Sequence, residues 1–245
     1  DRDPDATILS MHADWHLADP DGFRRAARAA LAAARKHDAL ITVGIRPSRT
    51  ETGFGYIVPG GAVGGAVRRV ERFREKPDRE EARRLIAEGA LWNSGLFAWT
   101  ARRFLEEVRT HAPEVAAALP LLAQQKVEQF FSSVQPIAVD VAVFERSGRV
   151  MTLPGDFPWD DVGAWDALAR LRQPDAAGNV AVGPVAMHEC RDCIAWSDGT
   201  PIVVSGLANV IVIHANERVL VLDRNRAADL KQTLDALPPD IRELP

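Results

Sequence analysis

The stretch "ALITVGI", residues 39–45, follows a segment from Phe23 to Ala34 in which alanine and larger apolar residues recur at helical spacing. Asp19 and Pro20 precede that segment and supply a capping acid and a proline suited to a first helical turn. A short, partly β-branched run, "ATILSM" at residues 6–11, comes before the helix and predicts a buried strand. Strand, helix and strand in this order predict a βαβ unit with a parallel sheet, so the expected fold class is α/β.

Composition narrows the classes of protein to consider. The chain has 245 residues, of which 47% are hydrophobic and 26% charged, enough for one large domain or a large and a small one. The net charge of −4 argues against a nucleic-acid surface, and no apolar run reaches transmembrane length. Two cysteines and the lack of a basic-then-apolar leader favour a reducing, cytoplasmic location with no membrane partner.

Further elements follow the first strand–helix–strand unit. The glycines of "YIVPGGAVGGAVRRVERF", residues 56–73, lack the spacing of a phosphate loop and predict a hairpin turn. "KPDREEARRLIAEG", residues 76–89, predicts a helix capped by Asp78, with Glu81 at the capping-box position. "LWNSGLFAW", residues 91–99, predicts a strand rich in aromatic residues, and helices are expected over residues 101–131.

The character of the chain changes near Gln173 to Gly178. Beyond that point short β-type runs alternate with Gly, Asn and Asp up to residue 223, which predicts a small all-β module of rungs or meanders. A last helix is expected over about Arg226 to Leu237. The predicted domains are therefore residues 1–173 and residues 178–245.

Two acids far apart in the chain are candidates to hold a cation. Asp14 follows the first predicted strand, and Asp161 lies in "PWDDVGAW", residues 158–165. Each could instead cap a turn, which is a common fate of an aspartate at a strand end. Two carboxylates from separate strand ends would suit Mg²⁺, which binds one or two carboxylates together with waters and phosphates. His12 and His16 flank Asp14 and are interpreted as neighbours, because histidine suits zinc better than magnesium.

A second set of polar residues suits a phosphorylated sugar. Lys76 could place a positive charge on a phosphate, and Glu75 could accept hydrogen bonds from sugar hydroxyls, although a surface ion pair is the simpler interpretation. Asn93 carries a donor and an acceptor, and Gly53 and Gly55 allow close approach of the backbone to a ligand; all three could equally serve a local turn. Since ligands of open α/β sheets bind beyond the carboxyl ends of strands, we expect both sets to converge on one cleft.

The sequence "CRDC", residues 190–193, leaves two alternatives. His188 and His214 could complete a zinc site with the two thiols, but the paired-motif spacing of zinc sites is absent. Two thiols packed inside the β-module are the favoured interpretation. The module and the last helix could also mediate self-association, so a homodimer is a further hypothesis.

Several motifs together resemble one known family. "TETGFGYI" (50–57), "FREKP" (73–77), "LWNSGLF" (91–97), "VAVFE" (141–145) and "PWDDVGAW", in this order and spacing, resemble the mannose-1-phosphate guanylyltransferases of the sugar-nucleotidyltransferase superfamily. "ILSMHADWHL" (8–17) resembles their strand-then-Asp metal segment. The resemblance implies a Rossmann-like nucleotidyltransferase domain with a small β-helix-like C-terminal domain. It also implies transfer of GMP from GTP to α-D-mannose 1-phosphate, giving GDP-mannose and pyrophosphate, with Mg²⁺ as cofactor.

The resemblance also assigns roles to residues. By position, Asp14 and Asp161 would hold Mg²⁺ and, with Lys76 on the sugar phosphate, form the catalytic set. The residues implied to bind substrate are Gly55, Glu75, Asn93, Asp140 and Glu145, the last two of which could instead brace the cleft.

The chain departs from the family pattern most strongly at its start. The family opens with a strand and a glycine-rich loop that binds the nucleotide phosphates, and no such segment precedes residue 6 here. The domain of residues 1–173 is therefore expected to lack its first strand and that loop, and this chain alone is expected to be inactive. A nucleotidyltransferase for another hexose 1-phosphate and a non-catalytic sugar-phosphate-binding regulator are the alternative functions.

Overall fold

The computed structural model describes residues 3–163, 165–238 and 241. Contacts divide the chain into two compact units. Unit 1 comprises residues 1–13 and 17–159, and unit 2 comprises residues 14–16 and 160–245. The division falls earlier than the predicted boundary near residue 173, because the segment after Trp159 packs with the β-rich module.

Unit 1 contains most of the helices and a mixed sheet. Its strands are β1 Thr7–Ser10, β3 Leu40–Ile45, β4 Tyr56–Gly64, β5 Val67–Arg74, β6 Leu91–Thr100 and β7 Val150–Pro154. Its helices are α1 Pro20–His37, α2 Arg79–Ala87, α3 Ala101–His111, α4 Pro113–Ala116, α5 Leu119–Ala123, α6 Val127–Ser133 and the π-helical turn η1 Asp140–Phe144.

The sheet has six strands in the order β1-β6-β3-β7-β5-β4, and β4 also pairs with β6. The first two predicted strands run in the same direction, as expected for a βαβ unit. They are not neighbours, however, because β6 lies between β1 and β3 and runs antiparallel to both. The sheet is therefore mixed, and β3 instead pairs in parallel with β7. The strand–helix–strand order predicted the relative direction of β1 and β3. It carried no information about β6, which lies about fifty residues beyond β3 in the chain.

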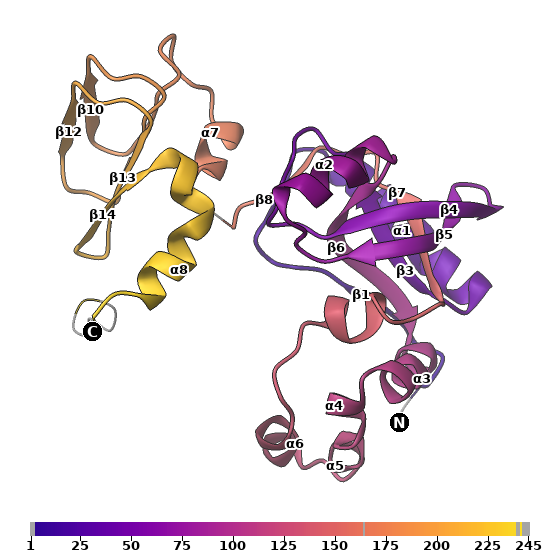
Figure 1. Cartoon of the computed structure of the whole chain (residues 1–245). Helices are drawn as coiled ribbons and strands as arrows, with labels where there is room; N and C mark the ends of the chain where they lie inside the picture. The colour runs from indigo at the N-terminus through magenta and orange to yellow at the C-terminus, as the bar shows by residue number, and fades with distance from the viewer. Residues whose placement is uncertain (1–2, 164, 239–240, 242–245) are drawn as a thin grey trace. The chain divides into compact units, whose positions relative to one another are not determined.

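Helix α1 lies against the sheet on β1, β3 and β6 (Figure 1). Its start is as predicted: the Asp19 carboxylate accepts hydrogen bonds from the backbone of Asp21 and Gly22, and Pro20 occupies the first turn. The buried face of α1 is a stripe of alanines that includes Ala26, Ala30 and Ala34. Small side chains let the helix approach the sheet closely. Within the described residues, none of the helices is long and apolar enough to span a membrane.

The elements between β3 and β7 also follow the sequence prediction. Strands β4 and β5 form the predicted antiparallel hairpin. Helix α2 is capped by Asp78, whose carboxylate accepts the backbone N–H of Glu81. Aromatic residues of β6 build the centre of the core, where Phe97 packs on Phe144 with ring centroids 4.3 Å apart. This packing anchors the π-helical turn η1 against the sheet.

Unit 2 contains the β-rich module. Its elements are β9 Val180–Val182, β10 Val185–His188, β11 Ile194–Ser197, β12 Ile202–Ser205, β13 Val210–Ala215, β14 Arg218–Asp223, α7 Ala167–Leu171, the 3₁₀ helix η2 Arg224–Asp229 and α8 Leu230–Asp235. Strands β9, β11 and β13 stack in parallel, as do β10 and β12, so the chain forms a coil rather than a meander. The antiparallel strand β14 ends the stack beside β13 (Figure 1). The expected β-helix-like module is thus present.

Candidate functional site

The Glu75–Lys76 pair lies directly after β5, where the backbone turns sharply. Lys76 has a φ of +45°, a left-handed conformation that a lysine adopts only when its surroundings impose it. One such restraint is visible: the backbone N–H of Glu75 donates to Glu145 Oε1 at 2.7 Å. Lys76 Nζ lies 3.5 Å from Glu75 Oε1, with the lysine side chain 65% exposed and the glutamate side chain 18% exposed. The turn therefore presents a solvent-facing ammonium beside a largely buried carboxylate.

Asn93 lies in the middle of β6 and is buried. Its Oδ1 accepts hydrogen bonds from Thr42 Oγ1 at 2.8 Å and from the backbone N–H of Gly95 at 3.2 Å, and its Nδ2 donates to Asp140 Oδ1 at 2.9 Å. These bonds fix the orientation of the amide. Asn93 is therefore a strand residue in a buried polar network, and the alternative of a turn residue is excluded.

Asp140 and Glu145 are brought to the same side of the chain by the π-helical turn η1. The backbone N–H of Glu145 donates to the carbonyl of Asp140 at 2.8 Å, a bond that spans five residues and aligns the two side chains. The Asp140 carboxylate accepts a hydrogen bond from the Asn93 amide, and the Glu145 carboxylate accepts one from the backbone N–H of Glu75. Glu145 thus braces the Glu75–Lys76 turn, one of the two roles left open by the sequence.

Gly55 is packed where no side chain fits. A Cβ atom at this position would lie 2.6 Å from Glu75 Oε2 and 3.2 Å from Asn93 Cβ. The carbonyl of Gly55 accepts the backbone N–H of Asn93 at 2.7 Å. The structure therefore brings together Gly55, Glu75, Lys76, Asn93, Asp140 and Glu145, six of the predicted site residues, within unit 1.

The carboxyl groups of this cluster are tuned by burial and by one another. Burial raises the pKa of Glu75, and the nearby charges of Asp140 and Glu145 raise it further, against the opposing effect of Lys76. Burial also raises the pKa of Asp140, with backbone hydrogen bonds, the Asn93 amide and the charge of His12 partly offsetting the effect. Such groups exchange hydrogen bonds readily with hydroxyls, because a carboxylate accepts them and a protonated carboxyl group donates one.

Asp14 and Asp161 lie together in unit 2. Asp14 comes directly before strand β2 (Trp15–Leu17), and Asp161 is the last residue of strand β8 (Trp159–Asp161); β2 and β8 pair in a two-stranded sheet. The backbone N–H of Val162 donates to the carbonyl of Asp14 at 3.1 Å. The strand β8 was not predicted, because a run of only three residues containing two acids has no recognisable strand pattern.

The residue after Val162 keeps the space around Asp161 open. A Cβ atom on Gly163 would lie 3.3 Å from Asp161 Oδ1 and 3.5 Å from Oδ2. A side chain at position 163 would therefore crowd the Asp161 carboxylate.

Asp14 and Asp161 place two carboxylates at the paired strands β2 and β8. Across residues 3–163, 165–238 and 241, no group of three or more His, Cys, Asp or Glu side chains could hold a metal ion. Magnesium is commonly held by one or two carboxylates, with waters and substrate phosphates completing the shell. His12 lies against Gly95 in unit 1, where its ring is 3.0 Å from the position that a Cβ atom would take, so it belongs with the Asn93 network.

An aromatic cluster near Asn93 was not predicted. Phe54 packs edge-on against Trp92 and Trp159, with centroids 5.2 Å away in each case. The guanidinium of Arg49 lies 5.0 Å from the Trp92 ring centroid and 5.6 Å from that of Phe54. An open hollow of about 690 Å³ at the carboxyl ends of β3 and β7 is lined in part by Trp92 and Trp159. Two arginines and one phenylalanine within residues 46–54, Arg46, Arg49 and Phe54, were the available signal.

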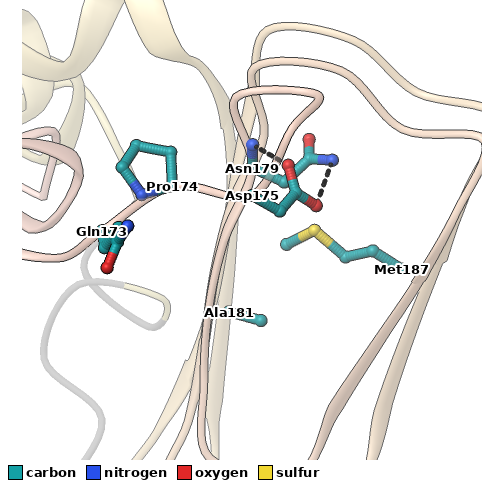
Figure 2. A pocket seen from close by; sticks show the side chains of 6 residues that line it. All are labelled: Gln173, Pro174, Asp175, Asn179, Ala181 and Met187. Carbon is teal, nitrogen blue, oxygen red and sulfur yellow. Dashed lines mark hydrogen bonds between the residues drawn. The ribbon is translucent and has the colours of Figure 1, made fainter.

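A smaller hollow of about 450 Å³ lies where the coil begins, beside Asp175 and Asn179 (Figure 2). The Asp175 carboxylate accepts the backbone N–H groups of Ala177 at 2.9 Å and Asn179 at 2.8 Å, and the Asn179 amide at 3.1 Å. These bonds lower the pKa of Asp175, with the backbone N–H of Asn179 as the largest cause. The acid therefore caps the first turn of the coil.

Cys190 and Cys193 are free thiols buried in the coil. Cys190 Sγ lies 3.3 Å from the carbonyl oxygen of Val204, and Cys193 Sγ lies 3.4 Å from that of Leu207. The thiols pack with Ala195 and Val212 inside the module. His214, the other group considered for a zinc site, makes a 3.0 Å contact through Nδ1 with Asp198 Oδ1. These contacts agree with the interpretation of the pair as packed thiols.

Comparison with known proteins defines the family. The nucleotidyl transferase family matches residues 3–177, so the chain belongs to it. A mannose-1-phosphate guanylyltransferase of Escherichia coli K12 is 33% identical over 97% of this chain and 52% of its own length. The alginate biosynthesis protein AlgA of Pseudomonas aeruginosa is 32% identical over 95% of this chain and 51% of its own length.

A solved structure supports the same assignment. A Thermus thermophilus protein described as a mannose-1-phosphate geranyltransferase superposes with a TM-score of 0.85 at 33% identity, covering 94% of this chain and 69% of that one. The predicted fold class and the resemblance to mannose-1-phosphate guanylyltransferases are confirmed. The chain spans about half the length of the curated relatives it matches.

Proposed function

We propose that this chain is part of a mannose-1-phosphate guanylyltransferase, which transfers GMP from GTP to α-D-mannose 1-phosphate and releases pyrophosphate. The observation that carries the proposal is the network of Glu75, Asn93, Asp140 and Glu145 packed around Gly55. Buried carboxyl and amide groups with fixed orientations suit a polyhydroxylated ligand, and Lys76 adds a positive charge for its phosphate. The names of two relatives at 33% identity supply the sugar and the base.

The proposed roles divide between the two units. In unit 1, Glu75 and Asn93 hydrogen-bond sugar hydroxyls, Lys76 pairs with the sugar phosphate, and Glu145 holds the turn that carries them both. Asp140 orients the Asn93 amide. In unit 2, Asp14 and Asp161 hold Mg²⁺, which when bound offsets the negative charge that phosphoryl transfer concentrates on phosphate oxygens.

The protein's own contribution is mainly positioning. Attack of a sugar-phosphate oxygen on the α-phosphorus of GTP requires the two anionic groups to be held close and in line. Lys76 lowers the electrostatic cost of that approach, and the fixed amide of Asn93 limits the orientations of the sugar. Convergence of Asp14 and Asp161 with the sugar-binding set remains a prediction, to be tested through their joint effect on turnover.

The experiment is an assay of the complete gene product with GTP, mannose 1-phosphate and Mg²⁺, following GDP-mannose and pyrophosphate together. We expect equal amounts of both products. Glucose 1-phosphate and other nucleoside triphosphates should give rates at least about tenfold lower, a difference of about 1.4 kcal/mol in barrier. Preference for another hexose 1-phosphate would refute the sugar assignment. Binding of mannose 1-phosphate without turnover would instead indicate a regulatory homologue.

A further inference from the structure

Asp160, which precedes Asp161 in strand β8, has a well-defined partner. Asp160 is held by Arg170 in a bidentate pair, with Nε 2.7 Å from Oδ2 and Nη2 2.9 Å from Oδ1. The third arm of the same guanidinium, Nη1, donates to Asp166 Oδ2 at 2.6 Å. The Asp160 side chain is 13% exposed and that of Arg170 is 25% exposed, so the pair is more shielded than an ordinary surface ion pair.

Arg170 is itself fixed by the core of unit 2. It belongs to α7, a helix of five residues whose Ala167 is fully buried. Leu168 and Ala169 of this helix pack against the cluster of Val180, Ile194, Ile211, Ile213 and Ala227 in the coil. The guanidinium therefore connects β8 to a rigid support.

Strand geometry relates this clamp to Asp161. Successive side chains of a strand point to opposite faces, so a residue that fixes Asp160 on one face of β8 also sets where Asp161 lies on the other. The backbone hydrogen bond from Val162 N–H to the Asp14 carbonyl then links this position to Asp14, which precedes the paired strand β2. Arg170 in addition balances two carboxylate charges, those of Asp160 and Asp166, a few residues from the proposed metal ligands.

We propose that Arg170 is a positioning residue for the cation site, which holds Asp160 against the module so that Asp161 and Asp14 are the carboxylates presented to a divalent ion. This inference rests on the proposed function, because it takes Asp14 and Asp161 as the metal ligands. It gives Asp160 a supporting role, distinct from the ligand role of its neighbour Asp161.

The test measures cation binding directly, with Mn²⁺ as the probe, by electron paramagnetic resonance on the complete gene product. Arg170→Leu should weaken Mn²⁺ affinity about tenfold, equivalent to about 1.4 kcal/mol. Arg170→Lys should weaken Mn²⁺ affinity less, about threefold, because lysine keeps the positive charge but cannot form the bidentate pair. Asp160→Asn keeps one acceptor oxygen, so it should also weaken Mn²⁺ affinity less than Arg170→Leu does. The half-saturating Mg²⁺ concentration in turnover should rise in the same order.

Controls separate positioning from general stability. Arg172→Leu changes an exposed arginine at the C-terminal cap of α7 and should leave Mn²⁺ affinity within about twofold of the wild-type value. Arg170→Leu and Asp160→Asn should be non-additive when combined, because both remove the same contact. If Arg170→Leu cannot be purified folded, Arg170→Lys and Asp160→Asn provide the same comparison.

Two results would overturn the inference, and they differ in scope. If Asp161→Asn weakens Mn²⁺ binding while the folded Arg170 and Asp160 variants bind normally, the inference is wrong and the metal assignment stands. If Asp161→Asn also binds Mn²⁺ normally, the metal assignment in the proposed function is wrong as well.

Discussion

The carboxyl groups packed around Gly55 in unit 1 and several acids of unit 2 have opposite surroundings. In unit 1, Glu75 and Asp140 lie among other carboxyl groups and have raised pKa values, to which burial contributes most. In unit 2, acids are met by N–H donors: Asp160 by Arg170, and Asp175 and Asp198 by backbone groups, which lower the pKa of the last two. Burial therefore raises the pKa of two carboxyl groups around Gly55, whereas backbone donors lower the pKa of Asp175 and Asp198.

The carboxyl groups around Gly55 and those at the paired strands β2 and β8 are proposed for different tasks. A site for sugar hydroxyls benefits from carboxyl groups held close together at fixed orientation, even at some cost in charge repulsion. A site for a divalent cation needs carboxylates that stay ionised and are aligned by a rigid support. Four predictions test whether the units can be perturbed separately, in order of decreasing expected effect.

The largest effect is expected from Gly183→Ala in the coil. Gly183 has a φ of +82°, and a Cβ atom there would lie 2.0 Å from the backbone oxygen of Ser197. Backbone strain and overlap together should destabilise unit 2 by about 3 kcal/mol or more. Hydrogen exchange with mass spectrometry should show faster exchange over residues 180–223, with unit 1 unchanged.

Gly206→Ala is the matched control for that variant. Gly206 has a φ of +70° but nothing within 4 Å of the Cβ position, so only the backbone cost of about 1–2 kcal/mol applies. Equal destabilisation by the two substitutions would show that the close approach to Ser197 is unimportant.

The next largest effect is expected from Asp161→Asn and Asp14→Asn, on turnover rather than on folding. Each should lower the rate of GDP-mannose formation by about 100-fold, or about 2.7 kcal/mol, because a neutral amide is a poor ligand for Mg²⁺. Asp156→Asn, at an exposed acid near β8, is the control and should be almost neutral. Losses below about tenfold, or 1.4 kcal/mol, would argue against the metal role.

Gly55→Ala should act on the sugar site of unit 1. The added methyl group would displace the Glu75 carboxylate, which lies 2.6 Å from the Cβ position. We expect the KM for mannose 1-phosphate to rise about tenfold, or about 1.4 kcal/mol, with a smaller change in kcat. Gly61→Ala, at a glycine with nothing within 4 Å, should leave both constants unchanged. An unchanged KM in Gly55→Ala would remove Glu75 from the sugar site.

The smallest effect is expected from Glu75→Gln, as a pH dependence of stability. Because the folded-state pKa of Glu75 is raised, the native state binds its proton more tightly than the unfolded chain. The group therefore favours folding most below its unfolded pKa of about 4.3, and this contribution is lost as pH rises through the raised folded value.

Glutamine does not titrate, so Glu75→Gln should not lose stability through this group as the pH rises. The unfolding midpoint of Glu75→Gln relative to wild type should increase from acid to neutral pH, measured by thermal denaturation at several pH values. Glu71→Gln, at an exposed position of β5, should show no such trend. A relative midpoint that falls towards neutral pH would show that the Glu75 carboxylate is stabilised by its surroundings.

Much of the local structure followed from the sequence. Capping residues predicted the starts of α1 and α2, and the glycine-rich turn predicted the β4–β5 hairpin, because these signals act within a few residues. The ordered motifs indicated the family and the residues gathered around Gly55. The placement of β6 between β1 and β3 was not predictable in this way, since strand pairing depends on contacts between distant segments.

The sequence by itself therefore determined the elements, the family and the candidate acids, all of which are encoded in short-range patterns and residue chemistry. Only the tertiary structure decided how those acids differ. Asp160, the neighbour of Asp161, forms a bidentate pair with Arg170, ten residues along the chain, which no local pattern indicates. Similarly, the raised pKa values of Glu75 and Asp140 arise from burial beside residues up to seventy positions apart, since local dielectric and charge depend on distance in space.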